Sequence, residues 1–258
     1  MINEFNILLI YGSFGFMIMT ISVVLIFIKY YRRNILAQQE LFKSEQKFNE
    51  DVIINNIKTL EVERKRYAQD LHDEIGASLS AIRLYTNDLI TKIDDPTLKD
   101  KATTVRDTID ESMASARRIA HNLIPPGLEL MGLQIITEEL ATKISANSSL
   151  KINVVFSDTK RLPFNSELML YRVVSELLNN TIKYASATQV TIAFTYAENN
   201  YLITYTDDGI GFDLLNENIK KGIGLQNIRS RVKIAGGNVE WISEPGKGMT
   251  VKIDIPTI

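Results

Sequence analysis

A histidine followed directly by an aspartate, His72-Asp73, is the pair of residues in this chain best suited to nucleophilic chemistry. A carboxylate can hold one imidazole nitrogen protonated and leave the other free to attack an electrophile. The residues one helical turn away, Ala68 and Gly76, are both small. Glycine inside a helix costs about 1 kcal/mol relative to alanine, so Gly76 indicates open space beside the imidazole, where another molecule can approach.

A lone histidine on a helix is more often a polar surface residue than a catalytic one, so this pair gains meaning only if a substrate site exists elsewhere. Later in the chain, Glu176 and Asn180 lie four residues apart on a predicted helix, with Lys183 one turn further on. Residues at this spacing share a helix face. An amide oxygen suits Mg²⁺ that keeps mostly water and phosphate ligands. Taken alone, these polar residues would form an ordinary solvated face.

Two glycine-containing motifs follow. The first, Asp207-Asp208-Gly209-Ile210-Gly211, comes directly after a predicted strand. A buried carboxylate at Asp207 can accept a hydrogen bond from the exocyclic amine of adenine. Gly209 and Gly211 let the backbone approach a ligand closely. A simple turn after a strand is the alternative interpretation.

The second motif, Lys221-Gly222-Ile223-Gly224-Leu225, places a glycine-rich loop at the start of a predicted helix. Free N–H groups and the helix dipole favour phosphate at such a position. A Gly246/Gly248 turn between the last two predicted strands completes the series.

These motifs resemble those of a known family. Residues Glu63 to Gly76 read Glu-Arg-x-Arg-x-x-x-Asp-Leu-His-Asp-x-x-Gly, which resembles the phosphoacceptor box of two-component sensor histidine kinases, in the NarX/DesK-like subfamily where His-Asp opens the box. The later motifs resemble the N, G1 and G2 boxes of the Bergerat (GHKL-type) ATP-binding fold, which histidine kinases share with DNA gyrase, Hsp90-type chaperones and MutL. The resemblance covers about residues 60–256.

The resemblance implies ATP and Mg²⁺ as cofactors and a role for each matching residue. The implied roles are phosphoacceptor for His72, Mg²⁺ ligand for Asn180, support of the metal and its water shell for Glu176, phosphate contact for Lys183, adenine recognition for Asp207, and the ATP lid for Gly222 and Gly224.

Two positions depart from the family pattern. The subfamily often has glutamine at the fourth position after the aspartate of the box, where it is thought to position water for dephosphorylating the partner regulator. This chain has Ala77 there, which leaves phosphatase activity open. The residue after the last glycine is commonly threonine but is Met249 here, with Thr250 next; we expect little consequence.

An apolar seam positions the His72 pair. Its residues recur at spacings of three, four or seven, which predicts a long helix with His72 at the edge of the seam, facing water. They are Leu60, Tyr67, Leu71, Ile75, Ile82 and Leu89. Asp94-Asp95-Pro96 ends this helix, and a second helix is predicted over Leu98–Leu123. Its apolar stripe consists of Val105, Ile109, Met113, Ala116 and Ile119.

The two helices should form an antiparallel hairpin whose seam is too wide for the hairpin alone. Pairing two hairpins into a four-helix bundle would bury it, so we expect a homodimer. His121, near the end of the second helix, has no acid beside it and is expected to have only a structural role.

Pro125-Pro126-Gly127 marks the next boundary. Beyond it, helices and strands alternate irregularly, which predicts an α+β two-layer sandwich with helices on one face of a mixed sheet. The first predicted helix comprises Gly132-Leu133 and Ile135–Ile144, and the other two cover Asn165–Ala185 and Gly224–Ala235. The predicted strands are Lys151–Ser157, Gln189–Tyr196, Tyr201–Asp207, Asn238–Ser243 and Thr250–Ile255.

The N-terminal segment predicts a membrane anchor. Ile7 to Ile28 contains no charged residue and is long enough to span a bilayer. Tyr30 and Tyr31 follow at interface depth, and Lys29, Arg32 and Arg33 place the following chain in the cytoplasm by the positive-inside rule. We expect a single pass through the inner membrane with the N-terminus outside. A cleaved signal peptide would need basic residues before the apolar run and a small-residue cleavage site after it. This sequence has neither, so a retained anchor is expected.

The predicted organisation is therefore multidomain. It comprises a transmembrane helix (7–28), a helical linker (29–59), a dimerisation and phosphotransfer domain (60–125) and an ATP-binding domain (126–258). The linker is expected to pair as a coiled coil; an amphipathic helix lying on the membrane is the alternative.

Composition limits the possible functions. The net charge of −2 over 258 residues provides no basic field for nucleic acid. The absence of cysteine excludes disulfides, zinc thiolate sites and thiol catalysis.

The sequence thus predicts a membrane-anchored sensor histidine kinase that phosphorylates itself on His72 with ATP, with Asp73 holding the opposite ring N–H. It would then transfer the phosphoryl group to an aspartate of a separate cytoplasmic response regulator. A stand-alone ATPase or protein-serine kinase of the same fold, and a catalytically idle scaffold, are the alternatives. The residues specify neither the stimulus, nor the regulator, nor whether phosphorylation occurs within or between subunits.

Overall fold

The computed structural model describes residues 2–157, 160–197, 199–214 and 223–256, with side chains described from residue 12 onward apart from Ser13 and Ile223. The chain divides into two units, residues 1–52 and 53–258. Helix α1 (Ile2–Asp70) belongs to both units because it runs across their boundary.

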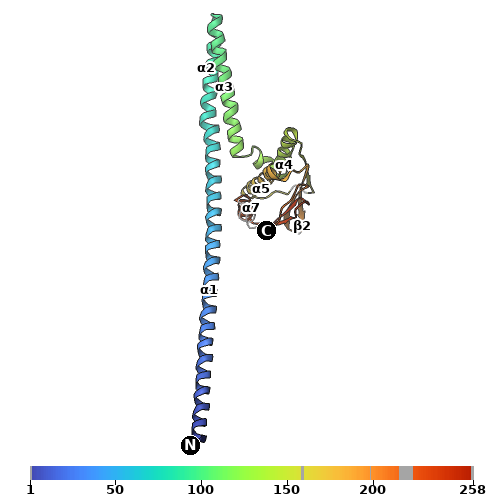
Figure 1. Cartoon of the computed structure of the whole chain (residues 1–258). Coiled ribbons are helices and arrows are strands. Elements are labelled where there is room, and N and C mark those ends of the chain that lie inside the picture. Colours follow the sequence, from blue (N-terminus) through green and yellow to red (C-terminus); the bar gives the residue numbers. More distant parts are fainter. Residues whose placement is uncertain (1, 158–159, 198, 215–222, 257–258) are drawn as a thin grey trace. The chain divides into compact units, whose positions relative to one another are not determined.

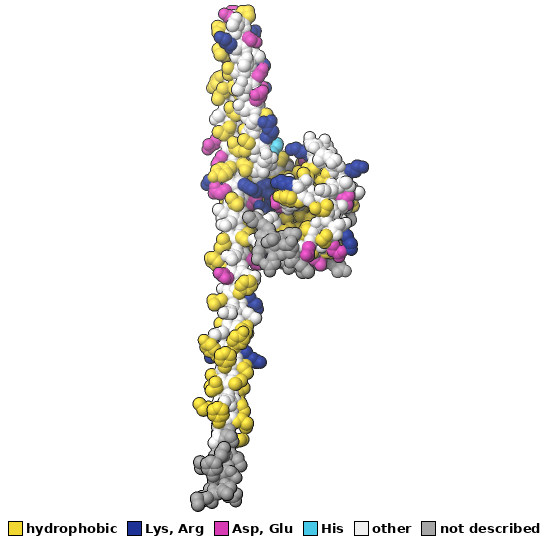
Figure 2. Space-filling model, in the orientation of Figure 1, with side chains coloured by type: hydrophobic (Ala, Val, Ile, Leu, Met, Phe, Trp, Pro, Cys, Tyr) yellow, Lys and Arg dark blue, Asp and Glu magenta, His cyan; other side chains and the backbone are white. Residues whose placement is uncertain are grey.

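The first unit is helical, and its part from Phe14 to Ile28 is apolar and exposed. Every side chain described between Phe14 and Tyr31 is exposed, and Figure 2 shows apolar side chains on the visible face of this segment. Among the described residues, one helical range (Phe14–Lys92) contains a stretch long and apolar enough to cross a membrane, with a mean hydropathy of 1.9. This agrees with the predicted anchor in length and composition.

The second unit begins with a helical hairpin. A π-helical turn, η1 (Leu71–Ile75), separates α1 from α2 (Gly76–Lys92), and α3 (Pro96–Leu123) returns alongside α2 (Figure 1). The start of α3 is capped by Asp95, whose carboxylate accepts from the backbone N–H groups of Thr97 and Leu98. The predicted break at residues 94–96 is therefore confirmed.

The predicted regular helix through His72 is wrong in one detail. At η1 the backbone N–H of Gly76 donates to the carbonyl of Leu71, five residues earlier, instead of four. Such π turns insert one extra residue into a helix and are frequent at functional sites.

The predicted apolar seam remains open in this single chain. Ile109 is the only residue of α2 and α3 that is classed as buried, and one ion pair between Arg83 and Asp110 (2.6 Å) joins the two helices. The exposed seam residues are Leu60, Tyr67, Ile75, Ile82, Leu89, Val105 and Ile119.

The rest of the second unit is an α+β sandwich, as predicted. Its elements are α4 (Leu128–Asn147), β1 (Lys151–Phe156), α5 (Phe164–Asn180), η2 (Thr181–Ala185), β2 (Gln189–Ala197), β3 (Asn200–Asp207), α7 (Ile223–Ile234), β4 (Asn238–Ser243) and β5 (Met249–Pro256). The strand order is β1-β2-β3-β5-β4, with β1 and β2 parallel and the other pairs antiparallel. Helices α4, α5 and α7 lie on one face of this mixed sheet (Figure 1).

Two predicted helices differ from the observed ones. The helix predicted from Gly132-Leu133 and Ile135–Ile144 begins earlier, at Leu128, ends later, at Asn147, and is kinked at Gly132. The helix predicted over Asn165–Ala185 is α-helical only to Asn180 and ends in the π turn η2. Strand ends agree within one or two residues, because period-two alternation of apolar residues marks the buried face of a strand directly.

The core lies between the sheet and its helices. Along β3, Tyr201, Ile203, Tyr205 and Asp207 are buried, so this face of the strand points toward the helices. Glu167 of α5 is also buried, and both its oxygens accept from Arg161, at 2.7 and 2.8 Å. A buried carboxylate needs such partners to offset its lost hydration.

A second buried carboxylate, Glu61 of α1, lies among three arginines. It accepts from Arg64 and Arg231 at 2.9 Å each and from Arg172 at 3.4 Å. Arg172 belongs to α5 and Arg231 to α7. One turn earlier on α1, Ile57 is buried in the same hydrophobic core as α5. This part of α1 thus packs against the two helices that border the nucleotide motifs.

Burial alone would raise the pKa of the Glu61 carboxyl, but the hydrogen bond from Arg231 and the charge of Arg172 lower it below its usual 4.5. A carboxyl with a lowered folded-state pKa stabilises the fold above its unfolded pKa, and this contribution is lost as the pH falls through the folded value. We therefore expect acidification from pH 7 to pH 4 to lower the melting temperature more in the wild type than in Glu61→Gln. At pH 7 the substitution should cost about 2 kcal/mol.

Thermal unfolding of the full chain in detergent measures both effects. Glu45→Gln, an exposed glutamate on the same helix, is the matched control and should follow the wild type. Identical pH profiles for the wild type and Glu61→Gln would contradict the assignment.

Candidate nucleotide site and histidine groove

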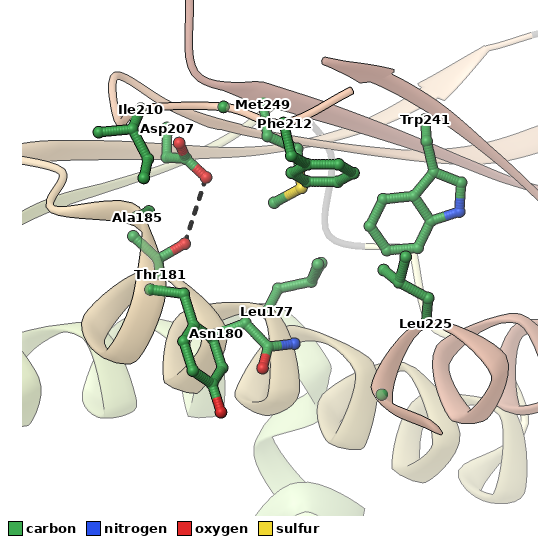
Figure 3. Close-up of a pocket in the computed structure, with 13 residues that line it drawn as sticks. Leu177, Asn180, Thr181, Ala185, Asp207, Ile210, Phe212, Leu225, Trp241 and Met249 are labelled. Carbon is green, nitrogen blue, oxygen red and sulfur yellow. Dashed lines mark hydrogen bonds between the residues drawn. The ribbon is translucent and has the colours of Figure 1, made fainter. Parts of the chain in front are cut away.

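A cavity of about 410 Å³ opens between the sheet and helices α5 and α7, with Asp207 at one end (Figure 3). Its lining comes from three of the sequence motifs and the elements beside them. The lining residues are Leu177, Asn180, Thr181, Tyr184, Ala185, Asp207, Ile210, Gly211, Phe212, Gly224, Leu225, Trp241 and Met249. In Figure 3 the Thr181 hydroxyl points from the helix toward the Asp207 carboxylate on the sheet side.

Asp207 is 3% exposed at the end of β3. Its Oδ1 accepts from the backbone N–H of Gly209 (3.0 Å), and its Oδ2 accepts from the Thr181 hydroxyl (3.2 Å). These two donors leave the carboxylate with further lone pairs. A buried acceptor facing a cavity of this size can select a ligand that carries an N–H donor.

The loop after Asp207 is held tightly against its neighbours. Ile210 donates its N–H to the carbonyl of Ala185 at the end of η2 (2.8 Å). A Cβ at Gly209 would lie 2.5 Å from that carbonyl oxygen, which is closer than real Cβ atoms come. Gly209 thus lets the backbone approach η2 and does not itself line the cavity, whereas the sequence predicted that it would let the backbone approach a ligand.

The turn between β4 and β5 closes on the same loop. Gly246 donates its N–H to the carbonyl of Ile210 (2.6 Å), and the Ser243 hydroxyl accepts from the N–H of Phe212 (2.9 Å). Gly248 has a φ of +72°, and a Cβ there would overlap the backbone carbonyl of Asp207. The predicted Gly246/Gly248 turn therefore fixes the end of β3.

Three predicted phosphate-side residues come together where α5 meets the start of α7. A Cβ at Gly224 would lie 3.4 Å from Oε1 of Glu176 and 3.7 Å from Nδ2 of Asn180. Asn180 and Gly224 line the cavity, whereas Glu176 lies just behind them. Because Gly224 lacks a side chain, space is left in front of the amide and the carboxylate.

Lys183 belongs to the π turn η2, is exposed and does not line the cavity. Gly222 lies outside the described residues.

The donors at this end of the cavity fit a hard cation held mainly by phosphate and water. Within the described residues no group of three or more His, Cys, Asp or Glu side chains could hold a metal by itself. An amide oxygen from Asn180, backed by the Glu176 carboxylate, suits Mg²⁺ that arrives bound to a nucleotide.

Thr181 and Tyr205 are functional candidates that the motif analysis missed. The Tyr205 hydroxyl is fully buried and lies 2.6 Å from the Thr181 hydroxyl, and burial raises the pKa of the phenol. A signal was present in the sequence, because Tyr205 and Asp207 are two residues apart on one strand and so share its buried face.

Asp208, the second acid of the motif, points elsewhere. Its carboxylate accepts from the hydroxyl of Thr188 (2.6 Å) and from the N–H groups of Thr188 and Gln189, and these hydrogen bonds, led by that of the Thr188 hydroxyl, lower its pKa. It joins the end of β3 to the start of β2 and does not line the cavity.

The His72 pair has the predicted geometry. The side chains of His72 and Asp73 are 83% and 74% exposed, and Nδ1 of the imidazole lies 3.0 Å from Oδ1 of the aspartate. This hydrogen bond occupies Nδ1 and leaves Nε2 open to solvent. His72 therefore has one nitrogen held by an acceptor and one available as a nucleophile.

A groove of about 440 Å³ runs beside His72 between α2 and α3. Gly76 and Ala77 line it, as expected for small residues near the imidazole, whereas Ala68 does not. A Cβ at Gly76 would meet only the Leu71 carbonyl at 3.6 Å, so the glycine leaves space rather than relieving a clash. His121, expected to have only a structural role, is exposed and lines the same groove together with Arg117.

Comparison with known protein families indicates which function the cavity and the groove beside His72 serve. The family described as histidine kinase matches residues 63–128, and the family described as histidine kinase-, DNA gyrase B-, and HSP90-like ATPase matches residues 165–258. The first match begins at the Glu63 that opens the His-Asp box. The second contains the nucleotide motifs from Glu176 to Gly248. The chain belongs to the histidine kinases.

Curated relatives of this histidine kinase are sensor proteins. The sensor protein VraS of Staphylococcus aureus (strain COL) is 25% identical over 217 residues, which cover 83% of this chain and 62% of that protein. The sensor histidine kinase ComP of Bacillus subtilis (strain 168) is 29% identical over 204 residues, covering 76% of this chain and 26% of that protein. The matched region thus spans less than two thirds of the length of either relative.

Among solved structures, the histidine kinase domain of the blue-light activated histidine kinase EL346 from Erythrobacter litoralis aligns with a TM-score of 0.45 and 17% identity, covering 70% of this chain and 94% of that one.

The turn between β4 and β5 provides a matched pair of glycines for testing how this histidine kinase builds its cavity. Gly246 and Gly248 both have positive φ, +82° and +72°, but only a Cβ at Gly248 would overlap another atom, the Asp207 carbonyl oxygen. We expect Gly248→Ala to weaken ATP binding more than about tenfold, because the end of β3 must shift. Gly246→Ala should cost only the left-handed strain of about 1–2 kcal/mol in stability and keep its affinity.

The chain's single tryptophan, Trp241, lines the cavity, so quenching of its fluorescence by ATP measures the affinity. Equal affinities in the two variants would contradict this account of the turn.

Proposed function

We propose that this protein is a membrane-anchored, homodimeric sensor histidine kinase. In this proposal it phosphorylates His72 with ATP and Mg²⁺ and passes the phosphoryl group to an aspartate of a separate cytoplasmic response regulator. The observation that carries the proposal is the exposed His72 with Nδ1 held by Asp73, in a chain that also contains a cavity with a buried acceptor, Asp207.

The His72–Asp73 contact supports a specific first step. With its proton on Nδ1 and accepted by Asp73, the ring presents the lone pair of Nε2. Nε2 attacks the γ-phosphorus of ATP in line, the N–P bond forms, and the bond from the γ-phosphorus to the bridging oxygen breaks to release ADP. The positive charge that develops on the imidazole is stabilised by the Asp73 carboxylate.

The cavity supports the nucleotide half of the proposal. Asp207 would accept the exocyclic amine of adenine, and the loops of Gly209 and Gly211 would approach the base. Asn180 would bind Mg²⁺ beside the phosphates near Gly224, and Glu176 would support the metal and its water shell. The ion would neutralise charge on the leaving group. Lys183 and Gly222 remain proposed phosphate contacts on the basis of the family resemblance.

The open seam of the hairpin supports the homodimer. Ile82, Leu89 and Tyr67 are 49%, 54% and 50% exposed in the single chain, and monomeric proteins rarely leave such a continuous apolar row in water. Pairing of two hairpins into a four-helix bundle would cover it. The proposed dimerisation and phosphotransfer domain is residues 60–125, and the proposed ATP-binding domain is residues 126–258.

The apolar N-terminal helix supports the membrane anchor. Residues 7–28 would span the inner membrane once, with the basic residues Lys29, Arg32 and Arg33 at the cytoplasmic side, and residues 29–59 would connect the span to the kinase. The groove beside His72 would receive the response regulator. Ala77 lines this groove, so the chain lacks an amide at that position for positioning water.

Substitution of the nucleophile tests the reaction. Incubation of the full chain with γ-labelled ATP should give a label that is lost in acid and retained in base, as expected for a phosphoramidate. His72→Gln should lose this label, by a factor of about 1000 or more, while its affinity for ATP stays unchanged.

His121→Gln is the matched control, because His72 and His121 are the only two histidines in the chain, and it should keep the label. Label that persists in His72→Gln would favour an ATPase or serine kinase of the same fold. ATP binding that fails in the wild type would favour a scaffold.

Substitution in the seam tests the dimer. We expect Ile82→Asp to weaken self-association of the full chain in detergent by about a hundredfold or more, because two apolar side chains per dimer are lost and two charges are desolvated. Asn87→Asp, which adds the same charge at an exposed polar position of α2, should leave the dimer intact. Sedimentation velocity separates the two species, and a dimeric Ile82→Asp would contradict the seam as the interface.

A further inference from the structure

We propose that Thr181 and Tyr205 are positioning residues that, through Asp207, make the cavity selective for a purine with an amine rather than an oxygen at the 6-position. This inference rests on the proposed function, in which the cavity binds a nucleoside triphosphate. It adds a determinant of base specificity formed by two side chains outside the glycine motifs.

The two residues reach Asp207 from different elements. Tyr205 and Asp207 project from the same face of β3, two residues apart, while Thr181 is the first residue of η2, directly after Asn180. Thr181 is 2% exposed and Tyr205 is fully buried. Distances of 2.6 Å from Tyr205 Oη to Thr181 Oγ1 and 3.2 Å from Thr181 Oγ1 to Asp207 Oδ2 connect the three side chains in a row.

The direction of these hydrogen bonds follows from counting protons. A threonine hydroxyl has one proton, and Thr181 donates it to the Asp207 carboxylate. Tyr205 must then be the donor to Thr181. Burial raises the pKa of the phenol, so it keeps the proton that it donates. The opposite direction would leave the buried tyrosine proton without an acceptor among the described residues, an arrangement that folded proteins avoid.

The consequence lies at Asp207. With Oδ2 accepting from the Thr181 hydroxyl and Oδ1 accepting from the Gly209 N–H, the carboxylate is fixed in orientation as an acceptor. It therefore presents only lone pairs to the cavity. The amine at the 6-position of adenine donates to such a group, whereas the carbonyl oxygen of hypoxanthine or guanine would face it as a second acceptor.

Removal of the Thr181 hydroxyl should relax this selectivity. In Thr181→Val, a side chain of nearly the same shape, the carboxylate loses one donor and its fixed orientation. It can then turn away from the 6-position of the purine, so both its hydrogen bond with an amine and its repulsion of an oxygen weaken. We expect the ratio of ATP to inosine triphosphate affinities to fall about tenfold, which is the effect of losing one hydrogen bond to a charged group. Thr181→Ser, which keeps the hydroxyl, should restore the wild-type ratio.

Tyr205→Phe removes the hydroxyl that donates to Thr181. Thr181 can still donate to Asp207 in this variant, but its hydroxyl no longer accepts a hydrogen bond from Tyr205 and is held less firmly. We therefore expect a smaller fall in the ratio of ATP to inosine triphosphate affinities, about two- to threefold. In the double variant Thr181→Val/Tyr205→Phe, the loss should equal that of Thr181→Val alone, because Tyr205 acts only through Thr181.

The measurement is quenching of Trp241 fluorescence in the full-length protein in detergent, with ATP, inosine triphosphate and purine riboside triphosphate, which carries no group at the 6-position. General damage to the cavity would weaken all three nucleotides equally, whereas loss of the proposed selectivity leaves purine riboside triphosphate unchanged. An unchanged ATP to inosine triphosphate ratio in Thr181→Val, or an equal loss for all three nucleotides, would overturn this inference while leaving the proposed function intact. A wild-type protein that binds none of the three would overturn both.

Discussion

The structure of the nucleotide domain depends on keeping one carboxylate, Asp207, buried at the edge of a cavity. A buried charge is tolerated only when donors replace its lost hydration. Gly209 supplies a backbone N–H from the loop after β3, and Thr181 supplies a hydroxyl from the end of α5. Because the two donors belong to different segments, the strand, the loop and the helix end must meet at this point. The close contacts of Gly209 with η2 and of Gly248 with the end of β3 follow from the same requirement.

The two reactive centres meet opposite demands. In the proposed function, Asp207 reads a base and must be shielded from water, so that its hydrogen bonds discriminate between ligands. His72 must be reached by a phosphate donor and then, in the proposed function, by a second protein, so it lies on an exposed helix face with only Asp73 fixing its ring. The segment of α1 that carries Ile57 and Glu61 packs on α5 and α7. The helix that leads into His72 is therefore in direct contact with both helices that border the cavity.

The sequence predicted much of the fold and most of the site. Strand ends agree within one or two residues, since alternation of apolar side chains records which face of a strand is buried. The helical hairpin and its break at Asp95 were also predicted, because an aspartate that caps a helix and is followed by proline is a local signal. The two π turns, η1 and η2, were not predicted. They differ from α-helix by one hydrogen-bond step, and neither composition nor periodicity reveals that step over five residues. Both occur at the residues of greatest interest, His72 and Thr181–Lys183.

The sequence by itself determined the chemical groups that are available: a histidine followed by an acid, an asparagine and glutamate on one helix face, and glycines after a strand. These are properties of residue type and local spacing, which can be read from the sequence without knowledge of the fold. Only the tertiary structure decided that Thr181 and Tyr205 join Asp207, and that His121 shares a groove with His72. It also decided that Glu61 is buried beside Arg172 and Arg231, which lie 111 and 170 residues further along the chain. Such contacts join segments far apart in sequence, and they form because a buried polar group takes whichever partner the packing of the core brings within reach.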